Sequence, residues 1–138
     1  MLEQARDFAA ECSSLNELLS GLPDARWDEP TQFKEWTAND IIGHLHIFDY
    51  AANLTLDSTD AVREFFAASR AGRSETWTLR DFTRQWLGGT GGSALRDRWY
   101  RFALQLAARY ELEDPVRRVA WGGPDMSTRS CKIGRAHV

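Results

Sequence analysis

One stretch of the chain, from Glu35 to Asp57, has the features of an amphipathic helix with a defined start. Thr37 can accept a hydrogen bond from the first helical turn. Asp40, three residues later, can bond back to the backbone N–H of Thr37, which is the capping-box pattern. This stretch therefore predicts a helix that starts after Thr37, ends near Asp57 and packs one apolar face against a core. The residues of that face recur at helical spacing and are Ile41, Leu45, Phe48 and Ala52.

The same helix carries two of the chain's three histidines, His44 and His46. His44 lies at the edge of the apolar face and is predicted to point inward. Residues two apart on a helix are separated by about 200° of rotation, so His46 cannot share a metal ion with His44. An inward histidine is either a hydrogen-bonded core residue or a ligand, and the spacing alone leaves both open. We expect His46 on a solvated polar face together with Asp49, Tyr50 and Asn53.

Four further stretches have apolar residues at helical spacing and end at a glycine, a proline or a polar break. They are Leu2–Ser20, Ala61–Arg70, Leu79–Leu87 and Ala94–Tyr110. Ser58 or Thr59 is the expected cap of the second stretch, Thr78 caps the third, and Ser93 could cap the fourth. The glycine-rich run before Ala94 lacks the Gly-Lys-Ser/Thr ending of a phosphate loop and is interpreted as a hinge. Apart from a short extended piece over Val116–Trp121, no strand is indicated, and the predicted class is all-α.

Composition and charge exclude several classes of function. With a net charge of -3 and an isoelectric point near 5.6, the chain has no strong positive field to attract nucleic-acid phosphates. No run approaches the roughly 18 apolar residues of a membrane span, and the N-terminus lacks the pattern of a signal peptide. The two cysteines, Cys12 and Cys131, are too few for a disulfide framework. We therefore expect a cytoplasmic domain that binds neither nucleic acid nor membrane.

Two motifs resemble those of a known family. The segment Trp36–His46 reads Trp-Thr-x-x-Asp-Ile-Ile-x-His-Leu-His, and Val119–Ser130 contains Trp-Gly-Gly-Pro-Asp-Met-Ser. Both resemble blocks of the maleylpyruvate isomerase family of mycothiol-dependent enzymes, which belongs to the DinB-like putative metalloenzymes. The resemblance covers residues 1–131. It implies a DinB-like four-helix bundle in which His44 is the first of three metal ligands.

The chain departs from the family's pattern near its C-terminal end. The resemblance implies a Glu and a His, four residues apart on the last bundle helix, as the other two metal ligands. No such pair follows Cys131, and residues 132–138 instead resemble the translation of a sequencing adapter. We therefore expect residues 1–131 to form an incomplete bundle lacking most of its fourth helix. Residues 132–138 are expected to be a non-native tail, in which His137 does not replace the missing ligand.

The resemblance implies a metal-dependent isomerase or S-transferase that uses mycothiol as its thiol. A divalent ion, expected to be zinc, would lower the pKa of a bound thiol and so supply a nucleophile at neutral pH. The expected partner is a small-molecule substrate; an arginine could contact it if it is acidic, but the sequence does not say which one. With His44 as the one ligand present, the 138-residue chain itself is expected to be inactive, and no catalytic acid or base is assigned. The alternative is a non-catalytic bundle that binds a partner or small ligand, with His44 as a core residue.

Overall fold

The computed structural model describes residues 3–113, 118–119 and 126–127 of the chain. The elements are α1 (Glu3–Ser20), the short 3-10 helix η1 (Asp24–Asp28), α2 (Ala38–Asp57), α3 (Thr59–Arg70), α4 (Leu79–Leu87) and α5 (Gly92–Glu111). Two short strands, β1 (Arg118–Val119) and β2 (Met126–Ser127), pair antiparallel after α5. Apart from this pair the described elements are helical, and the predicted all-α class is confirmed. The predicted tail and the predicted loss of a fourth helix concern residues outside the described ranges.

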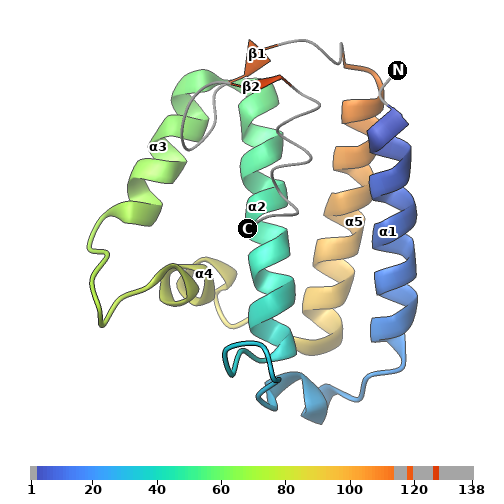
Figure 1. Cartoon of the computed structure of the whole chain (residues 1–138), viewed down its shortest axis with the longest axis vertical. Helices are drawn as coiled ribbons and strands as arrows, with labels where there is room; N and C mark the ends of the chain where they lie inside the picture. The colour runs from blue at the N-terminus through green and yellow to red at the C-terminus, as the bar shows by residue number, and fades with distance from the viewer. Residues whose placement is uncertain (1–2, 114–117, 120–125, 128–138) are drawn as a thin grey trace.

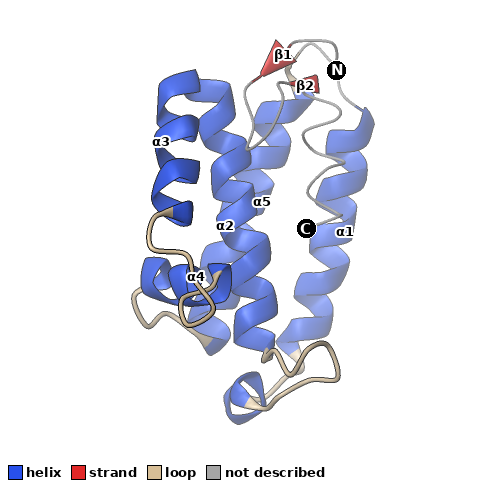
Figure 2. Cartoon of the chain, turned by 60° about the vertical axis from the view of Figure 1, so that its left-hand side comes forward, coloured by secondary structure: helices blue, strands red, loops and turns tan. Residues whose placement is uncertain are grey.

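Three long helices, α1, α2 and α5, stand side by side and form the body of the molecule (Figure 1). The helix α5 packs against both α1 and α2. On the other side of α2 lie α3 and α4, with α4 crossing near the lower end of α2 (Figure 1 and Figure 2). α2 therefore has neighbours on several sides, and this central position decides which of its side chains are buried.

The core lies where α1, α2 and α5 face one another. Trp99 and Leu95 of α5 are fully buried there, and Trp27 closes the core from η1. The phenol of Tyr110 donates a hydrogen bond to the carbonyl oxygen of Ala52 over 3.1 Å, which ties the end of α5 to α2. Burial of these large side chains is the main favourable term in the stability of such a bundle.

The starts of three helices follow from local sequence. Thr37 accepts a hydrogen bond from the backbone N–H of Asp40, whose carboxylate accepts one from the N–H of Thr37, each over 3.1 Å. A second capping box joins Thr78 to Asp81 at the start of α4. The hydroxyl of Ser58 accepts a hydrogen bond from the third residue of α3. The predicted caps of α2, α3 and α4 are thus confirmed.

The start of α5 differs from the prediction that Ser93 could cap it. The helix begins at Gly92, and its first N–H groups are bound by side chains from distant segments. The Oδ1 atom of Asn39 accepts a hydrogen bond from the N–H of Gly92 over 2.8 Å, and Asp24 Oδ1 accepts from the N–H of Ser93 over 3.1 Å. Gly92 has φ +59, and a Cβ there would lie 3.0 Å from Asp24 Oδ1, so the close approach of η1 requires a glycine.

The predicted solvated face around His46 is wrong. His46 is 2% exposed and Asp49 is 0% exposed, so both belong to the interior. The imidazole of His46 packs against Trp86 of α4 and Phe102 of α5, with ring centroids 5.1 and 5.4 Å away. The physical reason is that α2 is enclosed by α5 on one side and by α3 and α4 on another. A helix in that position buries more than one of its faces.

Candidate functional site

A polar cleft of about 620 Å³ lies at the start of α2, where four segments of the chain meet. Residues of η1, of the first two turns of α2, of α4 and of the loop that leads into α5 line it. The volume falls in the range of about 300–1,000 Å³ that is typical of small-molecule sites. The lining includes Asp24, Trp36, Asn39, Asp40, His44, Arg80 and Arg84.

Close packing of α4 on α2 brings the basic residues of α4 to this cleft. Gly43 of α2 provides the space, because a Cβ at that position would lie 2.7 Å from Leu87 Cδ1 and 3.5 Å from Thr83 Cγ2. Arg80 and Arg84 lie one turn apart on the same short helix, and both line the cleft. The cleft therefore depends on a contact between two helices that are about 40 residues apart in the sequence.

His44 lines the cleft between two aromatic rings. Its ring centroid lies 5.5 Å from that of Trp36, in an edge-to-face arrangement, and 4.7 Å from that of Phe48. The side chain is half-buried, so it is in contact with the aromatic surface and also borders the cleft. Two flanking rings restrict the orientation of the imidazole, which is the requirement for a preorganised ligand.

Asp40 and Arg84 form the strongest polar contact in the cleft. Arg84 donates from Nε to Oδ1 and from a terminal nitrogen to Oδ2, both over 2.8 Å. Burial by itself would raise the pKa of Asp40, but the hydrogen bonds from Arg84 and Thr37 and the charge of Arg84 lower that pKa below its usual value. The same pairing raises the pKa of Arg84. Asp40 is therefore an ionised carboxylate with a structural role: it closes the capping box with Thr37 and binds α4 through Arg84.

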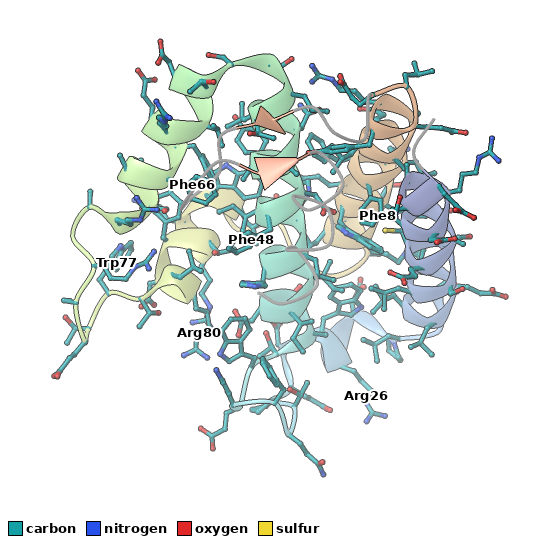
Figure 3. All side chains as sticks on the ribbon, turned by 45° about the horizontal axis from the view of Figure 1, so that its top comes forward. Phe8, Arg26, Phe48, Phe66, Trp77 and Arg80 are labelled. Atoms are coloured by element: carbon teal, nitrogen blue, oxygen red, sulfur yellow. The ribbon has the colours of Figure 1, made fainter. Side chains whose placement is uncertain are left out.

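Arg80 makes a different set of contacts from Arg84. Its guanidinium carbon lies 5.9 Å from the centroid of the Trp36 ring, and its closest approach to Asp40 is 4.0 Å, to Oδ2. Its side chain is 34% exposed. Within the described part of the chain it makes no hydrogen bond. Figure 3 shows Arg80 extending from α4 toward the segment that leads into α2.

His46 is separate from this cleft and lies in an aromatic cage. Burial, with a smaller contribution from the charge of Arg98, lowers the pKa of His46 from 6.5 to about 4. The imidazole is therefore neutral at pH 7, and its Nδ1 atom has no hydrogen-bond partner among the described residues. Sequence reasoning missed this burial. The available indication was Trp86, whose position on α4 allows it to reach the same face of α2.

The described residues do not complete a metal site. Within those ranges no three His, Cys, Asp or Glu side chains are grouped so that they could hold an ion. Asp40 lies one turn before His44, but both of its oxygens are bound by Arg84. Of the three metal ligands that the sequence resemblance implies, His44 alone lies in the described residues, and its role as a ligand stays a prediction. His137 and Cys131 lie outside the described residues.

Comparison with known proteins gives a family and two relatives. The family model described as the mycothiol maleylpyruvate isomerase N-terminal domain matches residues 8–137. Two uncharacterised proteins of Mycobacterium tuberculosis, from strains CDC 1551 / Oshkosh and H37Rv, are each 28% identical over 129 residues. The match covers 94% of this chain and 49% of each relative, so the chain spans about half their length. No solved structure gives a significant match. None of the helices in the described ranges combines the length and apolarity that crossing a bilayer requires.

Proposed function

Because the chain belongs to the family of the mycothiol maleylpyruvate isomerase N-terminal domain, we propose that it is part of a metal-dependent enzyme that uses mycothiol. The fold is the DinB-like helical fold of that family. In this proposal the enzyme is an isomerase or an S-transferase acting on a small molecule, and His44 is one ligand of a divalent ion, with zinc as the expected metal. The cytoplasmic location expected from the sequence remains a prediction.

The observation that carries the proposal is the position of His44. It borders a polar cleft of small-molecule size while Trp36 and Phe48 restrict its ring. A histidine sealed in a core would have no access to a ligand, and a histidine on an open surface would lack a fixed geometry. This intermediate position favours a binding role.

The chemistry that a bound metal would supply is activation of a thiol. A zinc ion with an open coordination position lowers the pKa of a bound thiol or water, so that a nucleophile exists at neutral pH. The described residues provide one ligand and leave the site incomplete, so His44 is assigned a binding role and no reaction step is derived through the metal. Ligands from outside the described residues are needed, and without them the chain is expected to be inactive.

A second candidate function is a non-catalytic bundle that binds a small ligand in the same cleft. This candidate needs no metal ion, and the described residues contain no complete set of metal ligands. In that case His44 is a core residue that packs between Trp36 and Phe48. The two candidates differ in whether the affinity for a metal ion depends on His44.

A titration with Co²⁺, followed by the ¹H–¹⁵N NMR spectrum of the 138-residue chain, separates the two. Co²⁺ is a paramagnetic substitute for Zn²⁺, and its effect falls off with distance, so even weak binding is located. We expect the largest changes at the indole N–H of Trp36 and the amides around His44. His44→Ala should abolish them, whereas the control His137→Ala should leave them in place. Equal changes in His44→Ala and the unaltered chain would remove His44 from the site and favour the second candidate.

A further inference from the structure

The two arginines of the cleft, Arg80 and Arg84, have different roles. Arg84 is paired with Asp40, because Nε and a terminal nitrogen of its guanidinium donate to the two carboxylate oxygens over 2.8 Å. Arg80 lies one turn earlier on α4, and within the described residues its contacts are the face of Trp36 and the 4.0 Å approach to Asp40. A separation of 4.0 Å is too long for a hydrogen bond. The N–H donors of Arg80 are therefore not used by the described residues.

The surroundings of Arg80 hold it in place and leave its donors accessible. The Trp36 ring, 5.9 Å from the guanidinium carbon, provides a flat surface for the guanidinium plane. About a third of the side chain is exposed, and it borders the cleft. Such an arginine is partly preorganised, so less conformational entropy is lost when it binds a ligand.

The acidic residues of the cleft are already engaged by other partners. The carboxylate of Asp40 is bound by Arg84 and by the N–H of Thr37. Asp24, which also lines the cleft, accepts from the N–H of Ser93 at the start of α5. The nearest carboxylate to Arg80 is thus neutralised by a closer arginine. Among the described residues, the charge of Arg80 interacts with Asp40 over 4.0 Å and with the neighbouring Asp81, and its N–H donors can still bind an incoming anion.

Trp36 contacts both Arg80 and His44. The same indole contacts the imidazole, at 5.5 Å between ring centroids, and the guanidinium of Arg80. A ligand group bound to Arg80 would lie beside the ring that also fixes His44. The cleft thus has an anion-binding group and a candidate metal ligand arranged around one aromatic side chain.

We propose that Arg80 binds a carboxylate group of the substrate in this cleft, with Trp36 supporting the guanidinium. The planar fork of N–H donors matches the two oxygens of a carboxylate and can bind both at once. That the bound carboxylate belongs to an enzyme's substrate rests on the proposed function. The assignment of a carboxylate site depends only on Arg80, Trp36 and the cleft.

The test is a titration of the metal-free 138-residue chain, in EDTA, with maleate, a small planar dicarboxylate. Affinity is measured by NMR chemical-shift changes and by calorimetry. We expect Arg80→Gln to weaken binding at least 10-fold. Arg80→Lys should weaken it about 3-fold or more, because lysine keeps the charge and loses the fork. Arg70→Gln is the matched control, because Arg70 also stacks on an aromatic ring, Phe66 at 5.8 Å, and does not line this cleft. It should change the affinity by less than 2-fold.

Two further measurements keep the proposal falsifiable if Arg80→Gln fails to fold. In the unaltered chain, maleate should shift the Nε–H resonance of Arg80 and the indole N–H of Trp36 together. Inorganic phosphate at the same concentration should bind more weakly, since a carboxylate fits the fork and the aromatic surface. The proposal is overturned if maleate does not bind, if Arg80→Gln and Arg70→Gln bind it alike, or if phosphate binds equally well.

The outcome is distinguishable from a failure of the proposed function. The maleate titration needs no metal, whereas the Co²⁺ titration tests His44 without an anion. If maleate binding depends on Arg80 but Co²⁺ binding does not depend on His44, the carboxylate site stands and the metal proposal fails. The reverse pattern rejects the carboxylate site alone.

Discussion

At the scale of single residues, Asp40 joins two structural features. It closes the capping box with Thr37 at the start of α2, and it holds α4 in place through Arg84. The first role could be predicted from sequence, because the two residues are three positions apart. The second could not, because Arg84 lies 44 residues further along the chain and sequence spacing gives no indication of that contact.

We expect Asp40→Asn to lower the free energy of unfolding by about 2 kcal/mol. The substitution removes the charge from a buried carboxylate that accepts two hydrogen bonds from Arg84. Urea denaturation at pH 7 measures this. Asp97→Asn is the control, because Asp97 pairs with Arg101 on the exposed side of α5 and such pairs contribute less than about 1 kcal/mol. Equal effects of the two substitutions would show that the Asp40 pair contributes little.

His46 should make the stability depend on pH. Folding lowers its pKa from 6.5 to about 4, so the unfolded chain binds the proton more tightly than the folded chain. Its contribution to stability is present above pH 6.5 and is lost as the pH falls toward 4. Between pH 7.5 and pH 5 the unaltered chain should lose about 2 kcal/mol more stability than His46→Gln, at about 1.36 kcal/mol per pKa unit.

Denaturation curves at a series of pH values in EDTA measure that difference. Groups other than His46 titrate in both proteins and cancel in the comparison. The predicted result is a shallower pH dependence for His46→Gln. Parallel curves for the two proteins would show that His46 is not held neutral by its aromatic surroundings of Trp86 and Phe102.

At the scale of elements, the position of the N-terminus of α5 depends on contacts between distant segments. The side chain of Asn39 accepts from the N–H of Gly92 and donates to Asp28 of η1 over 2.7 Å. It therefore joins α2, η1 and α5 at the border of the cleft. Sequence analysis placed the helix within two residues of its observed start but suggested the wrong cap, because Asn39 is 53 residues away from Gly92.

We expect Asn39→Ala to cost about 1–2 kcal/mol, the usual cost of losing a cap, and to speed hydrogen exchange in the first turn of α5. Ser93→Ala is the control. Ser93 is the cap suggested by the sequence, but its side chain is exposed and makes no hydrogen bond to the described residues. Its loss should cost less than about 0.5 kcal/mol. A larger effect of Ser93→Ala than of Asn39→Ala would contradict the observed capping.

The positions of the helices were predictable from local patterns. Which side chains of α2 are buried was not. The capping box of α2, the cap Thr78 of α4 and the three-to-four spacing predicted these two helices closely. The single apolar face assigned to α2 was too narrow, because periodicity assumes one buried side and α2 is enclosed by α3, α4 and α5. His46 was misplaced for this reason. The role of His44 as a metal ligand stays a prediction.

At the scale of the whole molecule, the candidate site lies at the start of α2, where η1, α4 and the loop before α5 come together. Four segments that are separate in the sequence supply it, so the motif could indicate His44 and Trp36 but could not single out Arg80 or its contact with Trp36. The chain belongs to the family of the mycothiol maleylpyruvate isomerase N-terminal domain and spans about half the length of its curated relatives, and the metal-dependent enzyme is a proposal. The central claim is that His44 binds a metal ion at this cleft.

The most direct test of that claim is to locate bound zinc by anomalous X-ray scattering, from crystals of the chain grown with Zn²⁺. The account predicts an anomalous peak in the cleft, about 2.0–2.1 Å from a ring nitrogen of His44, and no peak there in crystals of His44→Ala. Zinc bound only at other positions, with His44 still packed between Trp36 and Phe48, would contradict the account.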